Sequence, residues 1–344
     1  ADNHLNGSNP TQGTTLPAVA EMLNTLETLV GMGEMSKDLP DIFEKIAFNA
    51  LPAAFSADMR RVQRLEQANQ VLVSKEERPF YNAGPDATLY GDLFSFDAVR
   101  TLGAWPKLAG HLWYATVDGG LWAMSYAPCC VRTRLMDVPV RLRVSGGYPF
   151  AETVRLEVAV KRPVEFPLYL RIPAWVRQPM IYLPDGEIMQ VRAGETACVR
   201  RRWQTGDEVR LELSAAPHVS KGWYHQSAAV ELGPLLMAFA PETREGEDGR
   251  LDTPEEWGWA LVRDEPMKAV REGETEAPFK AGEAPVKVLA KAVPADWKLS
   301  EGSSAPVPIL PRLNVKETYT IELIPFGWTD LRISQFPIGE LRQE

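Results

Sequence analysis

The sequence lacks long apolar runs and has few cysteines. Proline, glycine or charge interrupts every apolar stretch before it reaches a membrane-spanning length, so no membrane span is expected. The first ten residues lack the basic start and apolar centre of a signal peptide and also an initiator methionine, so residue 1 is interpreted as a processing point or a cut. Three cysteines, Cys129, Cys130 and Cys198, cannot form a disulfide framework, which favours a reducing cytoplasm.

An excess of positive charge is also absent. Lysine and arginine number 37 against 46 aspartates and glutamates, which gives a formal net charge of −9 and a pI of about 5.2. Nucleic-acid binding draws its affinity from a broad cationic surface. The composition therefore predicts no nucleic-acid partner.

Motifs of several common chemistries are missing. The chain has no phosphate-binding loop, no dinucleotide fingerprint, no His-Glu-x-x-His pair and no Gly-x-Ser-x-Gly turn. The four histidines are scattered, and a single histidine is more often a hydrogen-bonding residue than a metal ligand. The neighbours Cys129 and Cys130 lie in an apolar segment that favours packing over metal binding. Neither a metal nor a cofactor is predicted.

Two regions differ in periodicity. The first hundred residues contain no tryptophan, and apolar residues recur at helical spacing from Thr15 to Val30 and from Pro40 to the residue before Pro52. These two segments predict an antiparallel helical hairpin. A third helix is expected over about residues 97–112, interrupted by Pro106.

Alternation with a period of two begins after Trp113 and predicts short antiparallel strands, the pattern of β-sandwiches. The segment 242–308, rich in Glu, Pro, Gly and Ala, is expected to hold long loops within or around the second sandwich. We therefore divide the chain into helical hairpins over residues 1–113, a first β-sandwich over 114–217 and a second β-sandwich with long loops over 218–344.

Two polar segments have the composition of carbohydrate sites. Residues 3–14 are dense in amides and hydroxyls that suit sugar recognition, and they include His4, Asn9 and Gln12. Residues 78–86 combine aromatic, amide and carboxylate groups and end at Asp86. The alternative interpretations are a solvated, capped loop for the first segment and an ordinary turn for the second.

Ordered motifs along nearly the whole chain resemble the β-L-arabinofuranosidase-like glycosidases of glycoside hydrolase family 127. The residues that carry the resemblance are His4-Leu5-x-Gly7-x-Asn9-Pro10-x-Gln12-Gly13-Thr14, Val19, Glu21, Leu26-Glu27, Ile46-Ala47-Phe48-Asn49-Ala50-Leu51-Pro52-Ala53, Gly84-Pro85-Asp86, Trp105-Pro106-Lys107, Tyr126-Ala127-Pro128-Cys129, Leu170-Arg171-Ile172-Pro173-Ala174-Trp175 and Pro325-Phe326-Gly327-Trp328-Thr329-Asp330-Leu331-Arg332-Ile333-Ser334-x-Phe336-Pro337.

The resemblance implies an α+β multidomain fold, in which the C-terminal part of an (α/α)6 barrel precedes two antiparallel β-sandwich domains. Members are about twice as long, so the chain corresponds to the C-terminal half. A barrel that lacks most of its hairpins exposes apolar faces. We therefore expect a partner chain, a missing N-terminal segment that completes the barrel, or a degenerate fragment.

The chemistry departs from the family pattern. Active members bind zinc through one Glu and three Cys, one of which is the nucleophile, and use another Glu as general acid/base. In this sequence the Glu-x-Cys pair matches Thr15 and Pro17, the adjacent cysteines match Phe96 and Asp97, and the acid/base residue matches Asn3. All five positions are substituted, so the residues do not support the cysteine and zinc mechanism.

Two functional hypotheses follow from the resemblance. In the first, the protein is a glycosidase that uses carboxylates on a plant-type glycan or oligosaccharide, with Asp97 as the leading candidate and a partner carboxylate upstream or at Asp2 or Asp86. The alternative interpretation of Asp97 is a helix N-cap. In the second hypothesis, the chain is a catalytically inactive carbohydrate-binding or assembly homologue, with its tryptophans packed in the core or in contact with a glycan.

Overall fold

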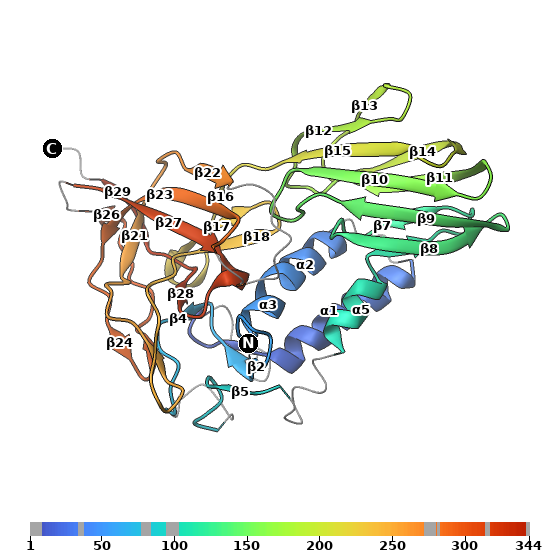
Figure 1. Ribbon diagram of the computed structural model, residues 1–344. Helices are drawn as coiled ribbons and strands as arrows, with labels where there is room; N and C mark the ends of the chain where they lie inside the picture. Colours follow the sequence, from blue (N-terminus) through green and yellow to red (C-terminus); the bar gives the residue numbers. More distant parts are fainter. Residues whose placement is uncertain are drawn as a thin grey trace.

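The computed structural model describes residues 9–33, 38–76, 84–93, 103–271, 280, 283–313 and 317–341. In the ribbon, the helical segments of the N-terminal region lie beneath a group of long strands, and a second group of strands lies beside them (Figure 1). Within the described part, no helix is long and apolar enough to cross a membrane.

Both segments with helical periodicity are helices. Helix α1 spans Leu16–Gly31, with Pro17 in its first turn, where a missing N–H costs nothing. The second helix is continuous but changes its winding, and its parts are α2 (Leu39–Lys45), a π-helical segment (Ile46–Ala50) and α3 (Leu51–Ala53). Both predictions are confirmed.

The third expected helix is seen only in part. Helix α5 spans Ala104–Gly110 with Pro106 near its start, whereas residues 97–102 lie outside the described residues. Within the described ranges, α1, the α2–α3 rod and α5 do not close an α/α barrel, because a ring of six hairpins needs many more helices. The chain after α3 instead forms short strand pairs, which are β2 (Arg61–Gln63) with β5 (Tyr90–Asp92), β1 (Thr14–Thr15) with β3 (Leu65–Glu66), and β4 (Asn69–Gln70) with β28 (Arg332–Ile333).

The strands after Trp113 form two sheets whose buried residues share one hydrophobic core, as in a β-sandwich. The six-stranded sheet has the order β13 (Ile188–Gln190), β12 (Arg177–Tyr182), β15 (Glu208–Ser214), β10 (Thr153–Val160), β9 (Val138–Ser145) and β8 (Cys129–Leu135). The four-stranded sheet has the order β14 (Thr196–Trp203), β11 (Val164–Arg171), β7 (Leu121–Ala123) and β6 (Trp113–Ala115), with β7 and β11 parallel.

The C-terminal strands join one nine-stranded sheet, where the periodicity predicts a second sandwich. Its path is β16 (His218–Lys221), β17 (Ala228–Leu232), β18 (Leu235–Ala238), β27 (Tyr319–Pro325), β23 (Val286–Pro294), β21 (Trp259–Val262), β29 (Ile338–Leu341) and β26 (Arg312–Leu313), with β22 (Lys268–Arg271) paired to β23. Small hairpins complete this region, namely β19 (Arg244–Glu245) with β20 (Leu251–Asp252) and β24 (Leu299–Ser300) with β25 (Ser303–Ser304).

The segment 242–308, expected to hold long loops within or around the second sandwich, also supplies strands to the nine-stranded sheet. Three strands of the nine-stranded sheet, β21, β22 and β23, come from it. Strand β23 alternates buried and half-buried side chains over most of its length, which is the pattern of a strand inside a sheet. The high content of Glu and Pro in the flanking segments concealed that alternation.

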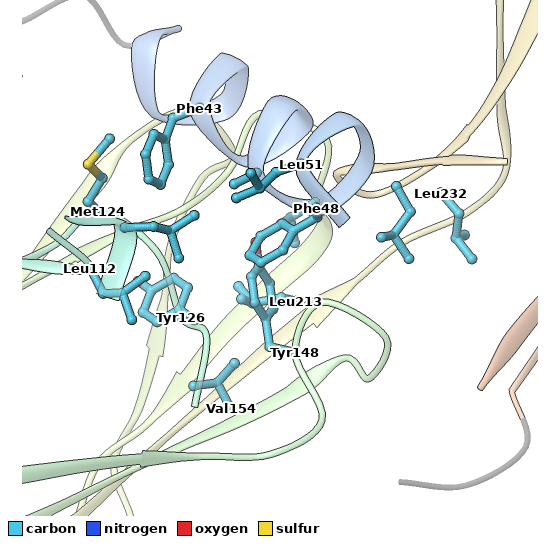
Figure 2. Packing of buried hydrophobic residues seen from close by; sticks show 14 of the residues in the cluster. Phe43, Phe48, Leu51, Leu112, Met124, Tyr126, Tyr148, Val154, Leu213 and Leu232 are labelled. Carbon is cyan, nitrogen blue, oxygen red and sulfur yellow. The ribbon is translucent and has the colours of Figure 1, made fainter. Parts of the chain in front are cut away.

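The α2–α3 rod packs against the sandwich through aromatic side chains. Phe43, Phe48 and Leu51 point from the rod towards Tyr126 and Tyr148 of the sandwich (Figure 2). The rings of Phe48 and Tyr148 meet edge to face with centroids 5.8 Å apart, a favourable aromatic geometry. This contact fixes the position of the rod and of the π-helical segment within it.

Candidate functional site

A cavity of about 460 Å³ lies where the N-terminal loop, the π-helical segment, β3 and the β17–β18 hairpin meet. Its walls are mainly apolar, with a few amide, hydroxyl and charged groups, a composition typical of small-molecule sites. The lining residues are Asn9, Pro10, Gly13, Thr14, Lys45, Ile46, Asn49, Ala50, Glu66, Gln67, Ala68, Trp223, Ala229, Glu231, Pro234, Leu235, Leu236, Phe326, Ser334 and Gln335.

Asn49 joins two walls of the cavity. Its Nδ2 donates to the carbonyl oxygens of Lys45 and Pro234 at 2.7 and 2.8 Å, and its Oδ1 accepts from the N–H of Leu236 at 2.8 Å. The π-helical winding around Asn49 is an arrangement that is frequent at functional sites. Asn49 therefore holds the rod against the β17–β18 hairpin and fixes the shape of the cavity.

Glu66 is the buried acid of the cavity. Its side chain is only 3% exposed, and neither carboxylate oxygen has a hydrogen-bond partner in the described part of the protein. Burial raises the pKa of Glu66 to about 7, although the charges of Arg332 and Lys280 act in the opposite direction. Glu66 is therefore protonated for a substantial fraction of the time near neutral pH, and its carboxyl group can donate a proton to a bound ligand.

Arg332 is the nearest cation to Glu66. The Arg332 Nη2 lies 3.5 Å from the Glu66 Oε2, which is a long ion pair rather than a hydrogen bond. The guanidinium group is held by other contacts, since Nε donates to the Gln67 carbonyl at 2.8 Å and Nη1 to the Thr329 carbonyl at 3.0 Å. It also lies over the ring of Phe326. Arg332 is thus fixed in place independently of Glu66.

A second, partly buried ion pair, between Lys280 and Asp330, acts on the charge of Glu66. Lys280 Nζ lies 2.8 Å from Asp330 Oδ1 and donates to the carbonyls of Ala53 and Phe55, and Tyr90 donates to the same Asp330 oxygen at 2.7 Å. Burial alone would raise the pKa of Asp330, but the ion pair and hydrogen bonds lower it below its usual value. Asp330 is therefore held by a cation and a hydroxyl group at Oδ1, whereas Glu66 has no hydrogen-bond partner among the described residues.

A second carboxylate and an aromatic ring line the more accessible part of the cavity. Glu231 Oε2 lies 2.9 Å from Lys45 Nζ, and its side chain is 19% exposed. Trp223 is 45% exposed. A half-exposed indole offers a flat apolar face of the kind that packs against a sugar ring.

The structure places the residues predicted from sequence in different surroundings. Asn9 lines the cavity, and its Oδ1 also accepts from the N–H and hydroxyl of Thr11, as in a capped loop. Gln12 is buried beside this loop, and its Nε2 has no partner among the described residues. Asp86 is exposed in a turn and does not line the cavity. Asn3, His4 and Asp97 lie outside the described residues, as does Asp2.

Sequence reasoning missed Glu66 and Glu231. Glu66 lies in a strand in which Leu65 is buried as well, so alternation gave no sign that a charged side chain points into a cavity. Thr14 pairs with Glu66 and Thr15 with Leu65 in the β1–β3 ladder. Glu66 therefore lies directly opposite Thr14, the residue before the position that the resemblance equates with a zinc-binding Glu.

The described residues at the zinc positions do not fit a zinc site. Thr15 has a neutral hydroxyl and Pro17 has no donor atom, whereas zinc requires thiolate, imidazole or carboxylate ligands. Within the described ranges, no group of three or more His, Cys, Asp or Glu residues could hold a metal. At the Cys129–Cys130 pair, burial raises the pKa of Cys129 to about 11, so its thiol stays protonated.

Comparison with known proteins finds one matching family model and several solved structures of similar fold. Residues 120–215 match the family model of the beta-L-arabinofuranosidase GH127 middle domain. No curated protein matches the sequence. A solved GH127 beta-L-arabinofuranosidase from Geobacillus stearothermophilus T6 is similar in fold, with a TM-score of 0.67 and 20% identity over 97% of this chain and 51% of that chain.

Two further solved structures have the same fold. A glycoside hydrolase matches with a TM-score of 0.70 and 18% identity over 96% of this chain and 53% of that chain. A GH127 beta-arabinofuranosidase matches with a TM-score of 0.69 and 15% identity over 96% of this chain and 50% of that chain. The chain thus spans about half the length of the solved structures it matches. Residues 120–215 thus resemble the GH127 middle domain, and nearly the whole chain shares the fold of these solved structures.

Proposed function

We propose that this protein is an arabinofuranosidase-like glycoside hydrolase that acts on a plant-type glycan or oligosaccharide and uses carboxylates in place of zinc and cysteine. The observation that carries the proposal is Glu66, a buried carboxyl group without hydrogen-bond partners among the described residues, whose pKa is about 7 and which lines a 460 Å³ cavity. A glycosidase needs a carboxylic acid that is still protonated near the working pH. Burial of Glu66 favours its protonated form and so meets this requirement.

The charged, aromatic and amide groups of the cavity have separate roles in this mechanism. Glu66 donates its proton to the glycosidic oxygen as the bond to the anomeric carbon breaks. Glu231 supplies the second carboxylate, which attacks the anomeric carbon or removes a proton from the attacking water. Lys45 holds Glu231 in position through its ion pair. Trp223 and the amide of Asn9 orient the sugar.

In this proposal the helices of the N-terminal region belong to a larger barrel. Helix α1, the α2–α3 rod and α5 would be the C-terminal part of a six-hairpin barrel, which a partner chain or an N-terminal segment completes. The divisions 1–113, 114–217 and 218–344 would be its three domains, and the cytoplasm its location. The apolar residues Met22, Leu29 and Ile42 support this view, because they are exposed on α1 and α2.

Hydrolysis of a panel of aryl glycosides, arabinofuranosides included, tests the proposal. Glu66→Gln keeps the shape of the side chain but has no acidic proton, so we expect kcat to fall about 10²–10⁴-fold. The alkaline limb of the wild-type pH profile should lie near pH 7, since the acid is lost as Glu66 ionises. Asp97→Asn tests the residue predicted from the resemblance. Equal turnover by the wild type and Glu66→Gln would reject Glu66 as the acid.

A catalytically inactive carbohydrate-binding or assembly homologue is the second candidate function. The half-exposed Trp223 beside a cavity with amide groups favours it, because such a wall holds a sugar without chemistry. Under this alternative the wild type binds arabinose oligosaccharides in calorimetry without hydrolysing them, and Trp223→Ala weakens binding about tenfold. Tyr319→Ala is the control, because it removes an aromatic ring that is 47% exposed and does not line the cavity. Trp175→Ala is unsuitable, because that ring packs against the core.

A further inference from the structure

The outer face of strands β8 and β9 carries four exposed arginines, Arg132, Arg134, Arg141 and Arg143. Arg132 lies directly opposite Arg141 in the ladder, and Arg134 and Arg143 each lie two residues away on the same face. We call this group the arginine face. Like charges directly opposite each other in a sheet repel, so the fold itself gains no stability from this arrangement.

The arginine face has little compensating negative charge. Neither β8 nor β9 contains an acidic residue, and the turn between them holds one, the exposed Asp137, beside Arg134. Within the part of the chain that the structure describes, Arg132, Arg141 and Arg143 form no ion pair. On the neighbouring strand, Glu157 lies opposite Arg143, whereas Ala159 lies opposite Arg141. The chain as a whole has a net charge of −9, so this face is a local exception.

A depression adjoins the arginine face and also reaches Cys129 and Val144, which belong to the other face of the sheet. The depression, of about 390 Å³, is lined by Cys129, Cys130, Arg141, Arg143 and Val144. Cys130 is small and exposed and lies opposite Arg143, so two guanidinium groups border the depression. A guanidinium group can bind a carboxylate through two parallel hydrogen bonds. The depression therefore has the charge and the donors to receive a carboxylate.

We propose that the arginine face binds an acidic polysaccharide through the carboxylates of its uronic acid units. Neighbouring strands lie about 5 Å apart and alternate residues of one strand about 7 Å apart, so the four guanidinium groups form a row that suits a repeating anion. The choice of a polysaccharide over an acidic protein rests on the proposed function. Glycan binding here would hold the polymer on the first sandwich while the cavity acts on it.

Binding of polygalacturonate to the full chain tests this proposal, with fully methyl-esterified polygalacturonate as the neutral comparison. We expect the wild type to bind only the acidic polymer, and to bind it more weakly as salt is added. Arg141→Ser together with Arg143→Ser should weaken binding at least tenfold. Arg200→Ser together with Arg202→Ser is the matched control, because these exposed β14 arginines have Asp118 and Glu165 as neighbours and should leave binding unchanged.

Three results would overturn the proposal: equal loss of binding in the control pair, equal binding of the esterified polymer, or tighter binding of poly-glutamate or of duplex DNA. Unchanged melting temperatures would show that both double variants fold. Glu66→Gln should bind polygalacturonate like the wild type, and the Arg141 and Arg143 double variant should hydrolyse small aryl glycosides like the wild type. Failure of the polysaccharide site is therefore distinguishable from failure of the proposed activity.

Discussion

Two fully buried glutamates, Glu44 and Glu66, have contrasting surroundings. Glu44 Oε2 lies 2.6 Å from Arg171 Nη2 and accepts a hydrogen bond from the hydroxyl of Tyr148 at 2.8 Å. Arg171 also pairs with Asp41 and donates to the carbonyl of Met124. Glu66, in contrast, has only the long ion pair to a guanidinium group that other atoms already hold.

The contrast separates a structural acid from a candidate functional one. Burial raises the pKa of both carboxyl groups, and at Glu44 the charge of Arg171 opposes the rise. The Glu44 cluster lies between α2 and the sandwich, where Oε2 of Glu44 is held by Arg171 and Tyr148, and Glu44 does not line the cavity. Glu66 lines a cavity and keeps its hydrogen-bonding capacity. A buried acid that lines a cavity and has no hydrogen-bond partner is therefore a stronger functional candidate than one held by an ion pair and a hydroxyl group away from the cavity.

Removal of Arg171 from the Glu44 cluster should have the largest effect on the free energy of unfolding. Arg171→Met leaves the carboxylates of Asp41 and Glu44 without their shared partner, and breaking a buried ion pair costs about 3–5 kcal/mol. Urea unfolding measures the loss. Arg200→Met, which breaks an exposed pair with Asp118, is the control and should cost at most about 1 kcal/mol. Similar losses for the two variants would contradict the structural role of Arg171.

The pH dependence of stability should distinguish Glu66 from its glutamine variant. The pKa of Glu66 rises from 4.5 to about 7 on folding, so its contribution to stability is fully present below pH 4.5 and is lost as pH rises through 7. Relative to Glu66→Gln, the wild type should lose on the order of 3 kcal/mol between about pH 4 and pH 8. Urea midpoints of both proteins across this range provide the measurement. A constant difference between them would show that Glu66 has an ordinary pKa in the folded protein.

The exposed ion pair of the cavity should have the smallest effect on stability. Lys45→Ala removes the partner of Glu231, and surface ion pairs contribute at most about 1 kcal/mol. Turnover should nevertheless change, because Glu231 loses the group that positions it. The two readouts are the urea midpoint and kcat on the best aryl glycoside. A large loss of stability would show that Lys45 has a structural role like that of Arg171.

Local patterns predicted the secondary structure well where they were strong. Helical spacing located α1 and the α2–α3 rod, and alternation located strands such as β10 and β15. In residues 242–308 the prediction of long loops did not identify β23, because a composition rich in Glu and Pro concealed this strand inside a sheet. The (α/α)6 barrel came from the resemblance alone, and the described helices do not close one.

Residues of the candidate site were harder to predict. The amide-rich loop was identified from its composition, and Asn9 does line the cavity. Asp86 belongs to a similar polar segment but lies in an exposed turn, because composition does not determine which side of a loop meets a cavity. Glu231 occupies a half-buried position of an otherwise apolar strand and gave no local signal.

The order of residues was sufficient to predict helices, strands and a family resemblance, since backbone preferences and side-chain alternation act over a few neighbouring positions. The state of Glu66 depends on the folded molecule. Its burial comes from β3, its nearest cation from Arg332 at the other end of the chain, and its cavity from the β17–β18 hairpin and the π-helical segment. Desolvation and charge pairing are set by groups that are close in space, and folding alone brings these groups together.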